Sequence, residues 1–388
     1  MSGWNRRQVL QGGLAGATLA AAPGLPAAGR DPDSLEGLAH AKGMHFGTAL
    51  GSRALSDPGY LDLVRAECGV LVPENELKMP FVQPKPGEFH FERADALLGF
   101  ADANSMAMRG HCLLWHHPRW LPRWMDDYDF GAEAAKSAGK LLVDHIAHTA
   151  THYGRRIGSW DVVNEAVDNI TGEMRETPLS KAIGSPDAVL EIAFHAARDD
   201  LPEAELVYND YMGWEPEDGP HRDGVLRLLE RFRKNKVPVN ALGIQAHIGS
   251  GNQDGNANRS FDVRDEKAWR KFLEDVTGMG YSLLITEFDV HDAPLPADFE
   301  PRDQAVAALG RAFLDVTLSF TQVNAVLCWG LMDTHSWLQW RNPRTDGLPK
   351  RPTPYDNHYK PKPLREAIAA AFRAAPPRRP TAIAGIPA

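Results

Sequence analysis

The chain has few cysteines and no excess of basic residues, and it has no apolar run long enough to cross a membrane. Its three cysteines, Cys68, Cys112 and Cys328, can form one disulfide bond at most, so a fold held together by a disulfide framework is excluded. Two of them lie within apolar runs, which predicts buried, unreactive thiols. The formal net charge of −9 argues against a nucleic-acid-binding protein, because such proteins need a basic face.

The first 29 residues predict an export signal rather than part of the fold. Arg6 and Arg7 precede an apolar run over 9–22, which is shorter than the roughly 20 residues of a membrane-spanning helix. Small residues suited to signal cleavage follow. An arginine pair before a weakly apolar run resembles a twin-arginine signal, so we expect a protein that is exported to the periplasm or secreted. An ordinary secretory signal is the alternative.

The rest of the chain alternates short apolar, β-rich runs with helical patterns. Several of these runs are almost wholly apolar, as in parallel strands that are covered on both faces. They recur about 40 residues apart, which leaves room for one helix and two loops between strands. The expected strands are 46–50, 69–72, 107–113, 159–163, 205–208, 241–246, 282–286 and 325–329.

The segments between these runs predict helices. Ser185, Pro186 and Asp187 supply an N-cap, a proline at the first helical position and an acid in the first turn. Further helices are expected at 224–234, 266–276, 302–320 and 362–374. Eight strands, each followed by a helix, predict an α/β fold with a single (β/α)8 TIM barrel over 30–375 and a flexible tail over 376–388. An open, doubly wound sheet is the alternative.

Polar residues recur where the predicted strands end, and in a barrel the active site lies at the C-terminal ends of the strands. Glu165 and Glu287 follow the fourth and seventh strands, so they face each other across the barrel mouth. Two facing carboxylates suit cleavage of a glycosidic bond. The alternative for each is a structural acid in a salt bridge. The polar strand ends are Glu74 and Asn75, His111, Asn164 and Glu165, Asn209 and Asp210, Gln245 and His247, Glu287 and Asp289, and Trp329 and Asp333.

Seven motifs carry a family resemblance. They are PENELK (73–78), GHCLLWH (110–116), WDVVNEA (160–166), YNDY (208–211), GIQAH (243–247), ITEFD (285–289) and WGLMDTHSW (329–337). Together and in this order they resemble glycoside hydrolase family 10, the retaining endo-β-1,4-xylanases, from about residue 44 to residue 363. Phe288 stands where the family more often has leucine. The segment 116–120 also departs from the family, which leaves the sugar contacts on the leaving-group side open.

The resemblance implies Glu165 as general acid/base and Glu287 as nucleophile. It implies that Asn164 binds the 2-hydroxyl of the sugar at the cleavage point, and that His247 contacts Glu287 with Asp289 behind it. The other implied substrate contacts are Glu74, Asn75 and Lys78 on the non-reducing side, His111, Trp115 and Gln245 at the cleavage point, Tyr208, and the wall residues Trp329 and Trp337.

The implied reaction is endo-hydrolysis of xylan with retention of the anomeric configuration. We expect the negative charge of Glu287 to favour the protonated form of Glu165. Xylan and xylo-oligosaccharides are the expected partners of a monomer that binds neither nucleic acid nor membrane, and no cofactor or metal is implied.

Other functions are weighed against this one. His145, His148 and His152 are spaced along one helical face, where a metal site is possible, but a packed or solvated face is the better interpretation. A sugar-binding barrel without catalysis is an alternative that would have lost one of the two glutamates. A barrel glucanase or mannanase is the nearest enzymatic alternative.

Overall fold

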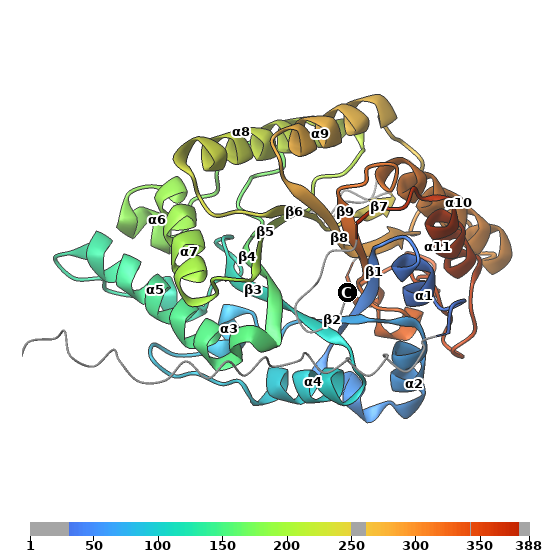
Figure 1. Cartoon of the computed structure of the whole chain (residues 1–388), viewed down its shortest axis with the longest axis horizontal. Helices are drawn as coiled ribbons and strands as arrows, with labels where there is room; N and C mark the ends of the chain where they lie inside the picture. Colours follow the sequence, from blue (N-terminus) through green and yellow to red (C-terminus); the bar gives the residue numbers. More distant parts are fainter. Residues whose placement is uncertain (1–30, 250–260, 342, 380–388) are drawn as a thin grey trace, which may run out of the picture.

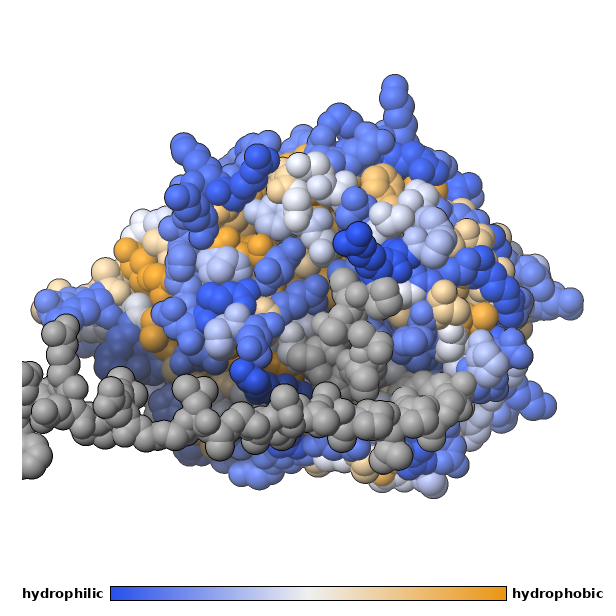
Figure 2. Space-filling model, viewed as in Figure 1, coloured by the Kyte–Doolittle hydropathy of each residue, from blue (hydrophilic) through white to orange (hydrophobic). Residues whose placement is uncertain are grey.

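The computed structural model describes residues 31–249, 261–341 and 343–379. The predicted signal at 1–29 and residues 380–388 of the predicted tail lie outside the described residues. No helix within the described ranges is long and apolar enough to cross a membrane. On the face of the molecule in Figure 2, hydrophilic residues predominate.

All eight predicted strands are present, and they close into a barrel with the helices around it (Figure 1). Neighbouring strands pair in parallel, and the pairings of β1 with β9 and of β6 with β8 complete the ring. The open-sheet alternative is therefore excluded. A short additional strand, β7 (His247–Gly249), pairs with the end of β8. The barrel strands are β1 (His45–Leu50), β2 (Val70–Pro73), β3 (Ala107–Trp115), β4 (Ile157–Asn164), β5 (Glu205–Asp210), β6 (Ala241–Ile244), β8 (Ser282–His291) and β9 (Val323–Cys328).

The helices begin where the sequence supplies caps. Ser185 caps α7 through the backbone N–H of Ala188, with Pro186 at the first helical position, as predicted. Two helices begin earlier than predicted, α8 at Gly219 and α10 at Phe299. The α-helices are α1 (Leu35–His40), α2 (Pro58–Glu67), α3 (Met79–Val82), α4 (Glu92–Ala103), α5 (Ala134–Tyr153), α6 (Pro178–Ile183), α7 (Pro186–Asp200), α8 (Gly219–Asn235), α9 (Glu266–Gly278), α10 (Phe299–Thr317) and α11 (Pro363–Ala374). The short 3-10 helices are η1 (Ser52–Ser56), η2 (Arg123–Met125), η3 (Gly154–Arg156), η4 (Pro216–Asp218), η5 (Asp333–His335) and η6 (Trp337–Gln339).

The core has two parts, one inside the barrel and one between the barrel and its helices. The inner part consists mainly of alanine, valine and leucine side chains from the strands, with Trp329 at its upper end. The outer part buries the large rings, among them Trp160 and Trp269. All three cysteines are free and buried, which confirms the burial predicted for the two that lie within apolar runs.

The three histidines of α5 form a helix face that is buried at His145 and exposed at His148 and His152. His145 is buried and hydrogen-bonds to the side chain of Gln83 at 3.0 Å and to the carbonyl of Leu113 at 3.1 Å. His148 and His152 stack on phenylalanine rings at 4.4 and 4.1 Å. Each imidazole is thus engaged within the fold, which confirms the packing interpretation of the histidine spacing.

The first and last parts of the described chain meet at the β1–β9 seam. Lys42 Nζ donates hydrogen bonds to the carbonyls of Arg373 and Ala375 at 2.8 and 2.9 Å. Arg378 donates to the carbonyls of Leu318 and Val323 at 3.0 and 2.7 Å. The fold therefore extends past the boundary predicted at residue 375, as far as Arg378.

Candidate active site

A cavity of about 320 Å³ opens at the C-terminal ends of the strands. It brings together most of the residues that the motifs predicted, namely Glu74, Asn75, Lys78, His111, Trp115, Asn164, Glu165, His247, Glu287, Trp329 and Trp337. His117, Arg119 and Trp120 also line it, as expected of the segment 116–120 at the border of the cleft. The remaining lining residues were not predicted and are Pro80, Phe81, Tyr211, Trp340 and Arg341.

Glu165 is buried directly after β4, and its carboxylate is held by two neutral donors. Trp115 Nε1 donates to Oε2 at 2.9 Å, and Gln245 Nε2 donates to Oε1 at 2.8 Å. The backbone of Glu165 has a φ of 55°, in the left-handed region that non-glycine residues rarely adopt. Its N–H donates to the carbonyl of Asn209 at 2.9 Å, which helps hold this conformation.

Burial raises the pKa of Glu165 to about 7, and the negative charges of Asp210 and Glu287 act in the same direction. The hydrogen bonds from Gln245 and Trp115 oppose this rise. The expected effect of Glu287 on Glu165 is thus present, but desolvation is the larger cause of the raised pKa. At neutral pH a substantial share of Glu165 carries a proton.

Glu287 lies on β8 and is equally buried, but it faces a cationic partner. His247 Nε2 donates to Oε2 of Glu287 at 3.2 Å, and His247 Nδ1 donates to Oδ1 of Asp289 at 2.9 Å. Against the effect of burial, Asp289 and Glu287 raise the pKa of His247 to about 10, so the imidazole is protonated. The predicted arrangement of these three residues is confirmed.

The pKa of Glu287 is lowered although burial acts to raise it. The hydrogen bond from His247 and the positive charges of neighbouring His111, His247 and Lys78 outweigh desolvation. Glu287 is therefore ionised at neutral pH, as a nucleophile must be.

Three amide side chains join the two glutamates. Asn209 Nδ2 lies 2.8 Å from Glu287 Oε1 and 2.9 Å from Asn164 Oδ1, and donates to both. Gln245 Nε2 lies 3.3 Å from the same Asn164 oxygen. Because the oxygen of Asn164 accepts on this inner side, its NH₂ group is directed away from the network. That orientation suits the expected contact with a sugar hydroxyl.

Gly243 makes room for this amide network. A Cβ atom at this position would lie 2.3 Å from Oδ1 of Asn209. That oxygen also accepts a hydrogen bond from Thr286 Oγ1 at 2.7 Å, so it cannot move aside freely. Residue 243 has to be glycine for Asn209 to reach Glu287.

Two predicted substrate contacts are corrected by the structure. Tyr208 is wholly buried and does not line the cavity; its hydroxyl donates to Asp210 and accepts from the N–H of Ala166 at 3.2 Å. Gln245 is also wholly buried, and it supports Glu165 from behind instead of lining the cavity.

Sequence reasoning missed the roles of Asn209 and Tyr211. Side chains alternate along a strand, so Asn209 points to the opposite face from Tyr208 and Asp210. Tyr211 lines the cavity, and its hydroxyl accepts a hydrogen bond from Arg175 at 2.7 Å. The alternation within YNDY was the signal that could have identified both residues.

The polar set predicted for the non-reducing side, Glu74, Asn75 and Lys78, lies together in the cavity. Lys78 Nζ donates to Asn75 Oδ1 at 3.0 Å and lies 4.6 Å from the ring centroid of Trp115. Burial raises the pKa of Glu74, and the charge of Lys78 opposes that rise. This set offers hydrogen-bonding groups to sugar hydroxyls.

His111 lies at the floor of the cavity and is fixed from below. Its Nδ1 lies 2.9 Å from Asp161 Oδ2, and Arg109 forms a 2.6 Å ion pair with the other carboxylate oxygen. The imidazole meets the ring of Trp329 edge-on at 5.2 Å. Both side chains therefore have fixed orientations at the sugar-binding surface.

The leaving-group side, where the sequence departs from the family, has an aromatic surface. Trp115 and Trp120 stack at 4.9 Å, and the guanidinium of Arg119 lies 5.1 Å from the ring centroid of Trp120. All three residues line the cavity.

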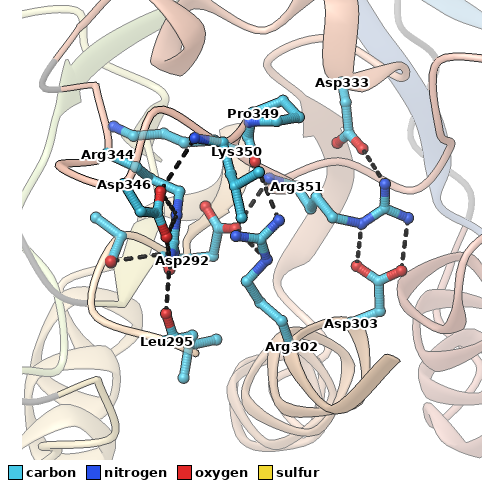
Figure 3. A network of polar contacts seen from close by, with 12 residues as sticks. Asp292, Leu295, Arg302, Asp303, Asp333, Arg344, Asp346, Pro349, Lys350 and Arg351 are labelled. Carbon is cyan, nitrogen blue, oxygen red and sulfur yellow. Dashed lines mark hydrogen bonds and ion pairs between the residues drawn. The ribbon is translucent and has the colours of Figure 1, made fainter. Parts of the chain in front are cut away.

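The segment that follows the wall residue Trp337 in the chain is joined to the end of β8 and to α10 by a polar network (Figure 3). Arg351 pairs with Asp303 through two hydrogen bonds of 2.6 Å. Arg344 donates to the carbonyls of Asp292 and Leu295, both at 2.9 Å. Trp337 itself donates from Nε1 to Asp289 Oδ2 at 2.8 Å. The wall is thereby fixed relative to the charged pair at Glu287.

One carboxylate that is kept protonated and one that is kept ionised meet the chemical needs of a glycoside hydrolase. Residues 34–371 match the model of glycosyl hydrolase family 10, and the chain belongs to that family.

Relatives and solved structures agree with this assignment. Endo-1,4-beta-xylanase B of Thermotoga neapolitana is 30% identical over 85% of this chain and 89% of its own. The crystal structure of native xylanase 10B from Thermotoga maritima superposes with a TM-score of 0.76 at 30% identity, covering 88% of this chain and 98% of that one. Xylanase 10B from Thermotoga petrophila RKU-1, solved in complex with xylobiose, gives a TM-score of 0.76 at 29% identity, with 88% and 97% covered.

Proposed function

We propose that the protein is an endo-β-1,4-xylanase that cleaves internal linkages of xylan with retention, with Glu165 as acid/base and Glu287 as nucleophile. The observation that carries the proposal is the opposite shift of two glutamate pKa values within one cavity. The relatives are endo-1,4-beta-xylanases, which supports the substrate class. The xylobiose complex of a structural neighbour supports a xylo-oligosaccharide ligand.

In the first step, ionised Glu287 attacks the anomeric carbon as Glu165 gives its proton to the departing glycosidic oxygen. The bond from carbon to the leaving oxygen breaks, and an ester bond to Glu287 forms. His247 stays protonated and returns its full hydrogen bond to Glu287 when the ester is later cleaved.

In the second step, Glu165 acts as a base. While Glu287 is esterified its negative charge is absent, so Glu165 loses its proton more readily. It then takes a proton from a water molecule that attacks the anomeric carbon, and Glu287 leaves as a carboxylate. Two inversions at one carbon give overall retention.

Proton NMR of the first-formed product tests the stereochemistry. We expect the β-anomer to appear first and the α-anomer to follow by mutarotation. An initial α-anomer would contradict the double displacement.

The selectivity for xylose over glucose is proposed to come from the Trp329 and Trp337 wall. Glucose carries a hydroxymethyl group on C5 that xylose lacks, and steric exclusion is a repulsive device that hydrogen bonds to shared hydroxyls cannot replace. Product profiles on xylan, β-glucan and mannan test this against the glucanase and mannanase alternatives. In the variant Trp337→Ala, the ratio of kcat/KM values should shift toward glucose-based oligosaccharides, and an unchanged ratio would favour the glucanase.

Export by the twin-arginine route and a monomeric state complete the proposal. Support for export comes from Arg6 and Arg7 in front of the weakly apolar run. Replacing both arginines by lysine should keep the precursor in the cytoplasm while the general secretory route still works, and unchanged export would return the segment to an ordinary signal. Light scattering of the mature protein measures its molar mass in solution and so tests the proposed monomeric state.

A further inference from the structure

A second cavity of about 220 Å³ adjoins the cleft at Glu74, one of the residues expected on the non-reducing side. The two cavities share Glu74, Trp329 and Trp340 as lining residues, so they lie next to each other. Pockets for drug-sized ligands usually measure ~300–1,000 Å³, so this volume suits one sugar unit rather than a further stretch of main chain. Below it is called the side cavity.

Most polar groups of the side cavity are already engaged by the protein. His335 pairs with Asp57 at 3.1 Å, and Thr334 donates to Asn357 at 2.7 Å. Gln339 donates to two backbone carbonyls at 2.8 Å each. These residues shape the walls and have few hydrogen-bonding groups left for a ligand.

Arg53 differs from them. It lies on η1, its side chain is exposed, and its guanidinium forms no hydrogen bond or ion pair with any residue of the described ranges. A guanidinium is a planar fork that binds a carboxylate through two parallel hydrogen bonds. An uncommitted arginine in a sugar-sized cavity therefore selects for an acidic group.

The other charges around the side cavity allow an anion to enter. Glu74 is the acidic residue that lines it, and burial raises the pKa of this carboxyl while Lys78 lies beside it. Asp57 is engaged by His335 and by the hydroxyl of Tyr359. Trp340, 70% exposed at the shared mouth, offers an apolar face on which a sugar ring can stack.

We propose that the side cavity binds an acidic sugar branch, a uronic acid carried by a xylose unit in the cleft, with its carboxylate on Arg53 and its ring against Trp340. This inference rests on the proposed function, because the branch is presented by a xylan main chain. The net charge of −9 sharpens the role of Arg53, since an acidic substrate needs a local cation to approach this protein.

The test compares three xylo-oligosaccharides of equal main-chain length: linear, with one uronic acid branch, and with one neutral arabinose branch. We expect Arg53→Gln to lower kcat/KM about tenfold on the acid-branched substrate, the size of one lost charge-assisted hydrogen bond, and to leave kcat/KM on the other two substrates unchanged.

Arg53→Lys should recover part of the loss. Added KCl should shrink the difference in kcat/KM between wild type and Arg53→Gln. The matched control is Arg93→Gln on α4, an exposed arginine outside both cavities, which should behave as wild type on all three substrates.

An unchanged rate of Arg53→Gln on the acid-branched substrate overturns the inference. An equal loss on all three substrates also overturns it, because Arg53 would then serve the main chain or the fold. If the wild type cleaves the linear substrate and either result appears, the inference alone fails. If the wild type does not cleave the linear substrate, the proposed function fails and the inference falls with it.

Discussion

The Glu165 side and the Glu287 side of the cleft contain the same residue type at nearly the same burial, 4% and 5% exposed, yet the two pKa values shift in opposite directions. Both carboxylates accept two side-chain hydrogen bonds. The difference is the charge of the donors: Glu165 receives only neutral N–H groups, whereas Glu287 receives one from a protonated imidazole. Desolvation thus sets a common upward shift, and on one side the hydrogen bond from His247, together with the charges around Glu287, reverses it.

The asymmetry depends on Asp289. A buried imidazole usually loses its proton, and desolvation does act to lower the pKa of His247. The carboxylate of Asp289, held also by Trp337, keeps the proton on His247. The nucleophile Glu287 is therefore kept ionised by His247, which Asp289 and Trp337 hold in turn. The pKa of the acid Glu165 is raised mainly by desolvation.

The largest effect is expected from removing either glutamate. Glu287→Ala should lower kcat on the order of 10⁵-fold, because no glycosyl-enzyme can form. Glu165→Ala should lower it roughly 10²–10⁴-fold on xylan but much less on an aryl xylobioside with a good leaving group. Azide should rescue Glu165→Ala as a β-glycosyl azide and Glu287→Ala only as the α-product. Identical rescue products, identified by NMR, would overturn the assignment of roles.

The next largest effect is expected from Gly243→Ala, which crowds the amide network between the two sides. Displacing Asn209 removes a hydrogen bond to a charged group, so kcat should fall roughly 10- to 100-fold. Asn209→Ala, which removes the same bond without crowding, should give a similar loss. Gly99→Ala on α4, where the new Cβ has no atom within 4 Å, is the control and should keep full activity. Full activity of Asn209→Ala would show that the network is not needed.

His247→Gln removes the cation that separates the two sides. The pKa of Glu287 should rise, so the acidic limb of the kcat/KM profile moves to higher pH and the rate at low pH falls about tenfold. His148→Gln on α5, which replaces an imidazole far from the cavity lining, should leave the profile in place. An acidic limb that stays fixed in His247→Gln would mean that another group sets the ionisation of Glu287.

The smallest effect is expected from Trp115→Phe, which keeps a ring but removes one neutral donor from Glu165. That donor lowers the pKa, so its loss should raise it further above about 7 and move the basic limb to higher pH, with a few-fold change in kcat. The matched control is Trp120→Phe, which changes the ring stacked against Trp115 and should leave the basic limb of the pH profile in place. A basic limb that moves to lower pH would contradict the role of this hydrogen bond.

The sequence predicted the barrel and both glutamates because strand spacing and strand-end polarity are local patterns. It could not rank the causes of the Glu165 pKa, since the degree of burial depends on side chains from separate strands, such as Trp115 and Gln245. The motif YNDY led to Tyr208, although strand alternation turns Asn209 toward the nucleophile. Gln245 was predicted to contact the sugar because the motif does not reveal how deeply a side chain is buried in the barrel.

The β1–β9 seam has a consequence for the order of biosynthesis. The strand that completes the ring is the last one made, and it pairs with the first, so a partly synthesised chain lacks a closed barrel until residue 328 has left the ribosome. The contacts of Lys42 with the carbonyls of Arg373 and Ala375 then join the two ends across more than 300 positions of sequence. The closed barrel that holds Glu165 and Glu287 on opposite sides of one cavity therefore forms only after β9 has been made.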